Sequence, residues 1–468
     1  MRTVRIAITA VLLGAMAVAT ALSITTLPFY DSTKGVPLLL YTAGLWVAFA
    51  LAYLLLRRIP LRAAVILIVV GAVGIGGAAM AGPPNTSTDS ARYAWDGIVQ
   101  TNGISPYEYG ATAPQLASIR PVWLFPSSCG GSRIQTSHEP GTDIVVCTAL
   151  NRGEVHTIYP PASELLFAGI RFVVGPDAQY WPMQLVGLLM SLGILAMLLV
   201  GLHRRGLDPR WAALWAWCPL VATEAVTNSH IDTFGALLLL AATLLASSGR
   251  RWAAGIALGA SIAAKLIPVI GAPALLRKQP WKIVIASVAT FLLLYVPYVI
   301  ASGVQVIGYL PTYLSEEGFN DGSRFALLTL VVRHQGALVL AIVLLLVLAV
   351  LVWRKSNAVS PWLGQVAMIG LTLLIVSPRY PWYALLLVPM IAMTGRWEWL
   401  AVPAVLTMRL LIPHITVTRP AEIVALTIIA LMTIYRAGPG WWPRLRAELR
   451  HPLRASPDRL MRVERAAP

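Results

Sequence analysis

The sequence predicts an all-α polytopic membrane protein: a bundle of about 13 to 14 transmembrane helices with one large extracytoplasmic loop. Composition is the first observation, because 57% of the 468 residues are hydrophobic, only 12% are charged, and the mean hydropathy is +0.71. Apolar runs long enough to cross a bilayer also recur along the chain. Basic residues occupy the short loops between these runs, as is typical of cytoplasmic loops.

The first spans are expected to end at residue 27, to cover 36–56 and to cover 63–81. Arg2 and Arg5 hold the N-terminus in the cytoplasm, and the basic turn after residue 56 is cytoplasmic again. The first run is expected to be a retained span rather than a signal peptide, because a second run follows from residue 36. This order of spans places residues 82–161 outside the cytoplasm.

The later spans follow the same alternation of apolar runs and basic loops. They are expected at 180–202, as two spans joined by a turn at 228–232, at 253–276, and as a span that ends at residue 300. The last spans are expected at 337–353, 362–376, 382–393, 400–412 and 423–435. The run 253–276 is interrupted at Lys265 and Pro268, and both of its ends are basic. We therefore predict two short helices that meet near the outer surface around Lys265.

The net charge of +16 does not indicate a nucleic-acid partner, because it is spread over cytoplasmic loops and the C-terminal tail. We expect the chain to comprise a membrane domain, residues 1–436, and a basic cytoplasmic tail, residues 437–468, which attracts anionic membrane lipids. The protein is then expected to lie in the plasma membrane with both termini in the cytoplasm.

The loop 82–161 is rich in Gly, Pro, Ser and Thr but also carries aromatic residues, which favours an ordered surface domain. Cys129 and Cys147 both lie in it, and a disulfide between them is plausible in an oxidising compartment, the alternative being two unpaired thiols. The remaining cysteine, Cys218, lies in an apolar segment and is expected to pack there.

The start of this loop carries an unusual group of charged residues. If residues 86–97 are helical, Asp89, Arg92, Tyr93 and Asp96 share one face. Either acid could act as a general base. The alternatives are that Asp89 is part of a capping box begun by Thr86, and that Asp96 only pairs with Arg92 on the surface.

Further polar residues are predicted to face the same side of the membrane. They are Tyr107, His156, Tyr159, His230, Asp232, Lys265, Arg324, Arg379 and Arg409. Acids, cations and aromatic rings on one face suit a lipid-linked, phosphate-bearing sugar, since cations hold phosphate and rings stack on sugars. Alternatively, His230 and Asp232 are ordinary loop-end residues and Lys265 extends to the membrane interface. An ionisable residue in apolar sequence nevertheless favours a functional role.

Other functional classes lack their motifs. The sequence has no Walker motif for an ATP-driven pump. It has no His and Cys spacing typical of a metal site, so no metal and no cofactor are expected, although Asp89 with Asp96 could bind a metal ion. A pair of matching broken segments, the mark of many secondary transporters, is also missing.

Three patterns occur in order along the chain. They are the Asp89, Tyr93, Gly103, Pro106, Tyr107 series; the Tyr159-Pro160-Pro161 opening with Leu166 and Phe167; and the run from Ala254 through Lys265 to Pro268. In these patterns the chain resembles the polytopic GT-C glycosyltransferases, and most closely glycosyltransferase family 87, which includes actinobacterial mannosyltransferases. The resemblance implies a GT-C-like bundle, a polyprenyl-phosphate sugar as donor, and Asp89 as the catalytic base.

Together these observations predict an inverting transfer of a sugar, with mannose the first choice, from polyprenyl phosphate to a glycolipid or lipoglycan. Asp96 is the alternative base. We expect Arg92, Lys265 and Arg379 to hold the donor phosphate, and Tyr93, Tyr107, His156, Tyr159, His230 and Asp232 to contact substrate. The alternative functions are an arabinofuranosyl- or other pentosyltransferase using decaprenyl phosphate, and a transporter or flippase for lipid-linked sugars.

Overall fold

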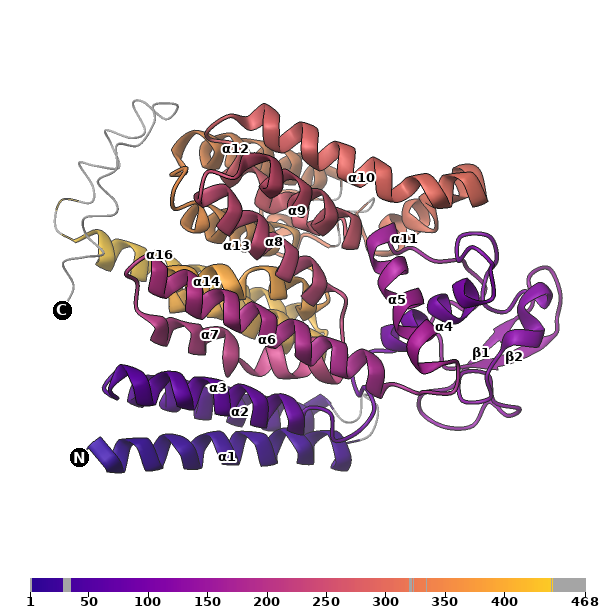
Figure 1. Cartoon of the computed structure of the whole chain (residues 1–468), viewed down its shortest axis with the longest axis horizontal. Coiled ribbons are helices and arrows are strands. Elements are labelled where there is room, and N and C mark those ends of the chain that lie inside the picture. The colour runs from indigo at the N-terminus through magenta and orange to yellow at the C-terminus, as the bar shows by residue number, and fades with distance from the viewer. Residues whose placement is uncertain are drawn as a thin grey trace.

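The protein is a bundle of helices with a small lobe at one end (Figure 1). The computed structural model describes residues 2–27, 35–319, 322, 324–333, 335–438 and 440. The predicted tail, residues 437–468, therefore lies outside the described residues from 441 onward. The chain is mostly helical, as the sequence predicted.

Within the described residues, seven helical runs are long and apolar enough to cross a membrane. They are α1 (Arg2–Thr26), α2 (Gly35–Leu56), α3 (Leu61–Ala78), α6 (Trp181–Arg204), the run Pro280–Glu316 that contains α10 (Pro280–Ser302) and α11 (Leu310–Glu316), α12 (Gln335–Lys355) and α16 (Ile415–Ala437). An eighth is counted if η3 (Val221–Thr227) and α8 (Asp232–Ser247), which meet at 111°, form one broken span. The protein is thus a multi-pass membrane protein.

The sequence predicted more spans because it counted shorter apolar segments as crossings. Several of these segments form helices of 7 to 15 residues, fewer than the roughly 20 that a bilayer requires. They are α9 (Arg251–Ala264), α13 (Trp362–Val376), α14 (Val388–Thr394) and α15 (Ala401–Leu411). The predicted interruption at Lys265 is confirmed, because α9 ends at Ala264 and the 3₁₀ segment η4 (Ile267–Leu275) follows.

The lobe is built from the segment between α3 and α5 (Pro161–Val174). It contains α4 (Asp89–Thr101), the 3₁₀ turn η1 (Pro114–Ile119) and the strands β1 (Gln135–His138) and β2 (Val145–Thr148). These two strands pair antiparallel, with Gln135 opposite Thr148, and are an exception to the all-α prediction. The lobe has its own apolar core, which includes Trp95, Leu124 and Leu150.

A larger core holds the bundle together. It joins α1, α2 and α3 to α6, α8, α13 and α14, and it includes the short helix α7 (Ala213–Ala216). Trp217, which follows α7, donates its indole N–H to the carbonyl of Ile68 in α3 at 3.3 Å. This hydrogen bond links α3 to the segment that follows α7.

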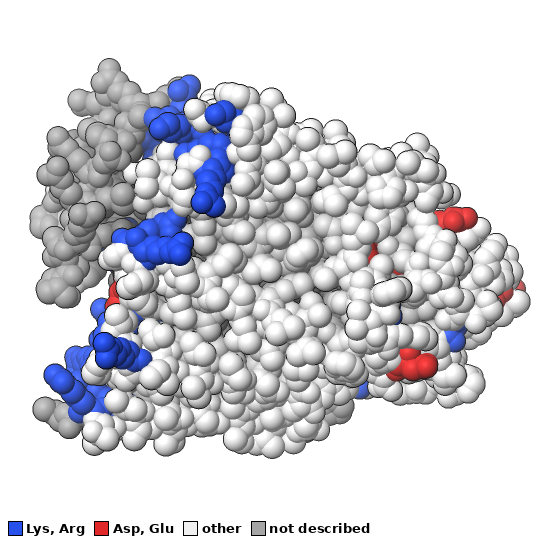
Figure 2. Space-filling view, in the orientation of Figure 1, with Lys and Arg blue, Asp and Glu red and all other residues white. Residues whose placement is uncertain are grey.

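Charge is distributed unevenly along the bundle. Lys and Arg side chains gather at the end that holds the N-terminus, whereas most of the visible Asp and Glu side chains lie on the lobe at the opposite end (Figures 1 and 2). The polar segments predicted to carry chemistry therefore lie at the end away from the basic loops.

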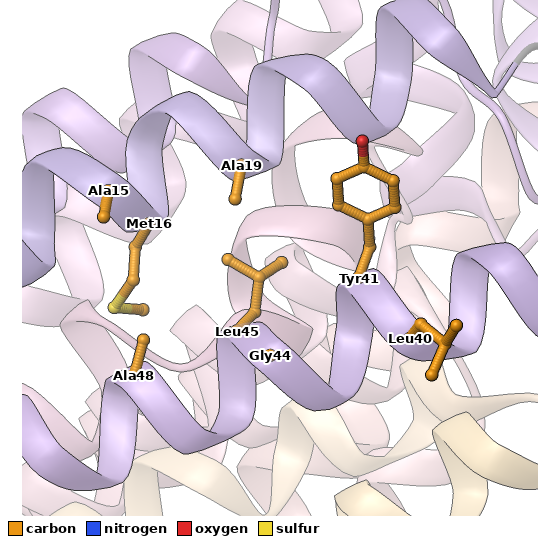
Figure 3. A pocket seen from close by; sticks show the side chains of 8 residues that line it. All are labelled: Ala15, Met16, Ala19, Leu40, Tyr41, Gly44, Leu45 and Ala48. Atoms are coloured by element: carbon orange, nitrogen blue, oxygen red, sulfur yellow. The ribbon is translucent and has the colours of Figure 1, made fainter.

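A shallow apolar groove of about 420 Å³ separates α1 from α2 (Figure 3). Its lining is mostly small or aliphatic: Ala15, Met16, Ala19, Leu40, Tyr41, Gly44, Leu45 and Ala48. Both helices are candidate spans, and none of the residues that line the groove is charged.

Candidate active site

A group of ionisable side chains lies where the lobe meets the bundle. We call it the polar cluster; its members are Asp89, Glu224, His230, Asp232 and Lys265. Asp89 begins α4, Glu224 lies in η3, and His230 lies in the break between η3 and α8. Asp232 begins α8, and Lys265 directly follows α9. Sequence reasoning identified four of these residues and missed Glu224, although an acid inside an apolar run is itself a signal of function.

Asp89 is the member of the cluster that the lobe contributes. It is the first residue of α4, and its Oδ1 accepts a hydrogen bond from Asn151 Nδ2 at 3.1 Å. Its Oδ2 lies 3.5 Å from His230 Nδ1. The side chain is 16% exposed, so it is not fully buried. Thr86 does not begin a capping box, because the N-cap residue of α4 is Thr88 and no side chain caps the helix; the Thr86 hydroxyl accepts a hydrogen bond from Asn228.

His230 lies in the break between η3 and α8, where Ser229 adopts a left-handed backbone with φ of 49°. Its imidazole is fully buried and stacks on Trp382 with 3.8 Å between ring centroids. Its Nε2 lies 3.2 Å from Glu224 Oε2, on the side of the ring away from Asp89. The bend in the chain thus places one imidazole between two carboxylates.

Lys265 and Asp232 form an ion pair with 2.5 Å between Nζ and Oδ2. The Asp232 side chain is fully buried, whereas that of Lys265 is 16% exposed. The ammonium group also lies 5.2 Å from the ring centroid of Tyr383. Lys265 follows the last residue of α9, so the interruption of that helix is what places the amine beside α8.

Aromatic rings line the same region. Tyr380 stacks on Trp382 with 4.4 Å between centroids, and Trp382 in turn covers His230. The hydroxyls of Tyr313 and Tyr383 are 3.1 Å apart. Such rings offer flat apolar surfaces of the kind on which sugars stack.

Arg379 is exposed and precedes this aromatic series. The turn that carries it begins at Ser377, which has a φ of 47°. The hydroxyl of Ser377 donates a hydrogen bond to Glu422 at 3.1 Å, which anchors the turn. Arg409 donates to the carbonyl of Ser377 and lies 3.5 Å from Glu422. Arg379 is therefore a cation presented by a buried, well-bonded turn.

Arg92 is placed differently from the other two predicted phosphate ligands. Its guanidinium is buried and donates to the carbonyls of Asn151 at 2.9 Å, Arg152 at 2.7 Å and Val155 at 3.2 Å. These bonds tie α4 to the segment that also supplies Asn151 to Asp89. The contacts of Arg92 are thus structural.

Asp96 points into the lobe–bundle contact rather than toward the polar cluster. It is 2% exposed, and its Oδ2 has no hydrogen-bond partner among the described residues. Burial raises the pKa of Asp96 from 3.8 to about 7 and raises the pKa of the neighbouring, fully buried Glu164 well above its usual range. Thr157 and Gln100 donate to Glu164 at 2.7 and 2.8 Å.

The predicted tyrosines lie in the same contact and are buried. Tyr93 stacks on Phe167 with 4.6 Å between centroids, and Tyr107 donates its hydroxyl to the carbonyl of Tyr159 at 2.5 Å. His156 is half-buried, and this burial lowers its pKa. These side chains join α4 and the lobe to α5, and a role in substrate binding stays a prediction.

The lobe is cross-linked by a disulfide between Cys129 and Cys147, whose Cα atoms are 4.9 Å apart. Cys147 lies in β2, so the bond fixes the hairpin to the loop before it. In the described part of the chain, no group of three or more His, Cys, Asp and Glu residues is arranged to hold a metal ion.

Part of the chain is similar to known proteins. Residues 157–378, which include Glu224, His230, Asp232 and Lys265, match glycosyltransferase family 87. A polyprenol-phosphate-mannose-dependent alpha-(1-2)-phosphatidylinositol pentamannoside mannosyltransferase of Mycolicibacterium smegmatis is 25% identical over 311 residues, or 61% of this chain and 71% of the relative. No solved structure matches the chain significantly. Over residues 157–378 the chain is thus similar to the glycosyltransferases of family 87.

Proposed function

We propose that the protein transfers mannose from polyprenyl phosphate to a glycolipid or lipoglycan acceptor, with inversion at the anomeric carbon and Asp89 as the base. The observation that carries this proposal is the position of Asp89. Asp89 is the partly exposed acid of α4, and its carboxylate lies beside the imidazole of His230. That imidazole stacks on Trp382, and the Lys265–Asp232 ion pair belongs to the same polar cluster.

The reaction is a single displacement. Asp89 takes the proton of the acceptor hydroxyl while the acceptor oxygen bonds to the anomeric carbon of the donor. The bond from that carbon to the phosphate oxygen breaks, and polyprenyl phosphate leaves with the electron pair. Lys265 and Arg379 stabilise the negative charge that develops on the phosphate. Arg379 is exposed, and the side chain of Lys265, although paired with Asp232, is 16% exposed.

Asp96 is the weaker candidate for the base. Its burial beside Glu164 gives it no route to an acceptor hydroxyl, and a pKa of about 7 leaves it largely protonated in mildly acidic medium. Arg92 is not included in the proposed phosphate site, because both of its terminal nitrogens already donate hydrogen bonds to backbone carbonyls.

The choice of mannose and of the acceptor class is supported by the relative from Mycolicibacterium smegmatis, whose name specifies polyprenol-phosphate mannose and a phosphatidylinositol mannoside. The basic loops at the end opposite the lobe support an extracytoplasmic site with cytoplasmic termini. The proposed domain organisation is one membrane domain, residues 1–436, followed by a basic cytoplasmic tail.

The test uses the purified full-length protein in lipid nanodiscs. Radiolabelled polyprenyl-phosphate mannose and, in parallel, the decaprenyl-phosphate arabinose donor are offered with phosphatidylinositol mannosides as acceptor. We expect a mannosylated lipid product with the wild type and a loss of at least about 100-fold with Asp89→Asn. Product from the arabinose donor alone would indicate a pentosyltransferase, and movement of donor across the bilayer without product would indicate a flippase.

A further inference from the structure

Arg152 lies in the part of the lobe that precedes α5, directly beside the proposed base. Its backbone adopts the left-handed conformation, with a φ of 51°, which is uncommon for a residue of this kind. The residue before it, Asn151, donates a hydrogen bond to Asp89 at 3.1 Å. Arg92 donates to the carbonyls of Asn151 and Arg152, at 2.9 and 2.7 Å. The strained backbone at Arg152 is therefore held in place next to Asp89.

The side chain of Arg152 extends from the lobe to α11. Its Nε donates to Glu316 Oε2 at 2.9 Å, and its Nη2 lies 2.8 Å from the same oxygen. The guanidinium lies 5.5 Å from the ring centroid of Tyr313 and 6.0 Å from that of Tyr309. The Tyr309 hydroxyl donates to Glu316 Oε1. We call these four residues, Arg152, Tyr309, Tyr313 and Glu316, the lobe–α11 group.

A close backbone contact also attaches the start of α11 to the lobe. Gly308, two residues before α11, has a φ of 63°, and a Cβ at this position would lie 2.5 Å from the carbonyl oxygen of Thr157. This approach therefore requires glycine. Further back, Ser302 donates to Ser105 of the lobe at 2.6 Å. The segment that leads into α11 thus stays attached to the lobe when the Arg152–Glu316 pair is removed.

The lobe–α11 group adjoins the residues proposed to meet the donor phosphate. The hydroxyl of Tyr313 is 3.1 Å from that of Tyr383, whose ring centroid lies 5.2 Å from Lys265 Nζ. Aromatic side chains therefore connect the group to the polar cluster without a break.

Tyr380 shows that the group is also close to the base. Burial raises the pKa of Tyr380 to about 12, and the charges of Glu317 and Asp89 raise it as well. The charges of Arg152 and Arg379 lower this pKa. The Tyr380 hydroxyl is thus within electrostatic reach of the base, of an exposed arginine from the lobe and of an exposed arginine from the bundle.

The chemistry of the lobe–α11 group suits a neutral sugar. The side chains of Arg152 and Glu316 are 36% and 39% exposed. An arginine has more donors, and a carboxylate more acceptor sites, than one ion pair uses, so both can also bond sugar hydroxyls. Tyrosine rings add apolar surface for the C–H face of a sugar. A phosphate fits less well, because the negative charge of Glu316 offsets that of the guanidinium.

We propose that the lobe–α11 group binds the sugar of the acceptor that precedes the reacting one, an inference that rests on the proposed function. The reacting hydroxyl meets Asp89, and the preceding sugar lies against α11. Arg152 donates to its hydroxyls, Glu316 accepts from them, and the Tyr309 ring packs against it. The enzyme therefore selects acceptors that already carry a chain of sugars.

The test compares two acceptors in nanodiscs, phosphatidylinositol with a single mannose and phosphatidylinositol with a chain of several, each with polyprenyl-phosphate mannose as donor. We expect the wild type to have a kcat/KM at least about 10-fold higher for the chain acceptor. Arg152→Asn, which tolerates the left-handed backbone, and Glu316→Gln should each raise KM for the chain acceptor at least about 10-fold. KM for the donor should stay within about twofold.

Glu154→Gln is the matched control, because Glu154 is an exposed acid that pairs with His138 inside the lobe. It should keep the wild-type constants for both acceptors. The double variant Arg152→Glu/Glu316→Arg restores an ion pair with reversed polarity, so the sugar hydroxyls meet the wrong partners and KM for the chain acceptor should stay raised. Thermal midpoints confirm that each variant is folded. If Arg152→Asn does not fold, Glu316→Gln decides the question.

Equal kcat/KM of the wild type for the two acceptors would overturn the subsite, as would wild-type KM values in Arg152→Asn and Glu316→Gln. Recovery of the wild-type KM in the double variant would show that the ion pair only joins the lobe to α11. A rise in donor KM alone would place the group at the donor, and it also contradicts the proposal. Failure of the proposed function is distinct, because the wild type would then make no mannosylated product from either acceptor.

Discussion

Asp232 and Lys265 form the closest ion pair of the polar cluster, with 2.5 Å between Oδ2 and Nζ, although one begins α8 and the other follows α9. The carboxylate is fully buried and its Oδ1 has no hydrogen-bond partner among the described residues. The ionised form of Asp232 therefore depends on the ammonium group of Lys265, whose side chain is 16% exposed.

Lys265→Met should consequently destabilise the protein as well as slow the reaction. Removing one partner of a buried ion pair leaves an uncompensated charge, which typically costs about 3 kcal/mol. We expect a lower thermal midpoint in nanodiscs and weaker donor binding. The double variant Lys265→Met/Asp232→Asn should regain most of the stability but not the donor affinity. Equal midpoints for the single and double variants would contradict the dependence of Asp232 on Lys265.

Asp96→Asn should leave most of the activity intact. Asp96 is buried with a pKa of about 7, so the amide resembles the protonated form that predominates in mildly acidic medium. We expect kcat at pH 6.5 to stay within about threefold of the wild type, whereas Asp89→Asn loses at least about 100-fold. Label transfer with both variants at equal protein amounts measures the difference. A loss of activity in Asp96→Asn as large as that in Asp89→Asn would return Asp96 to consideration as the base.

Asp96 should also make stability depend on pH. Its pKa is raised in the folded protein, so the folded state binds a proton more tightly than the unfolded chain does. The stability from this proton is fully present below pH 3.8, the ordinary pKa, and is lost as pH rises through about 7. Glu164 adds to this trend in the same direction, because its pKa is raised as well.

The measurement compares thermal midpoints of the wild type and Asp96→Asn between pH 5 and pH 8. The wild type should lose stability relative to the variant as pH rises, and the two curves should run parallel above about pH 8. Parallel curves across the whole range would mean that Asp96 titrates near its ordinary value in the folded protein.

The sequence identified several local features correctly, because their causes are local. The charged helix was expected at 86–97 and is observed at Asp89–Thr101, since the 3.6-residue period is a property of the segment itself. The interruption after α9 follows from Pro268, and the start of α5 follows from its prolines. These elements position Asp89 and Lys265.

The contacts that decide the chemistry were not predictable in this way. Glu224 meets His230 only because η3 and α8 join at 111°, a bend that no period in the sequence encodes. Trp382 reaches the imidazole from a segment more than a hundred residues later. Asp89 and Asp96 also share a helix, and only the packing of α4 on α5 separates an accessible acid from a buried one.

Arg379 and Arg92 should respond to substitution in opposite ways. Arg379 is exposed, so Arg379→Gln should raise KM for the polyprenyl-phosphate donor and leave the thermal midpoint within about 1 °C of the wild type. Arg92 is buried and donates to three carbonyls. Arg92→Gln should therefore cost about 2 kcal/mol or more of stability.

Steady-state kinetics and thermal unfolding on the same preparations separate the two effects. Any loss of activity in Arg92→Gln should track the loss of folded protein, so activity per folded molecule should change less than it does in Arg379→Gln. Arg57→Gln serves as the control, because it removes an exposed arginine from the turn after α2, remote from the lobe. A donor KM in Arg379→Gln equal to that of Arg57→Gln would remove Arg379 from the phosphate site, leaving Lys265 as the cation that meets the leaving group.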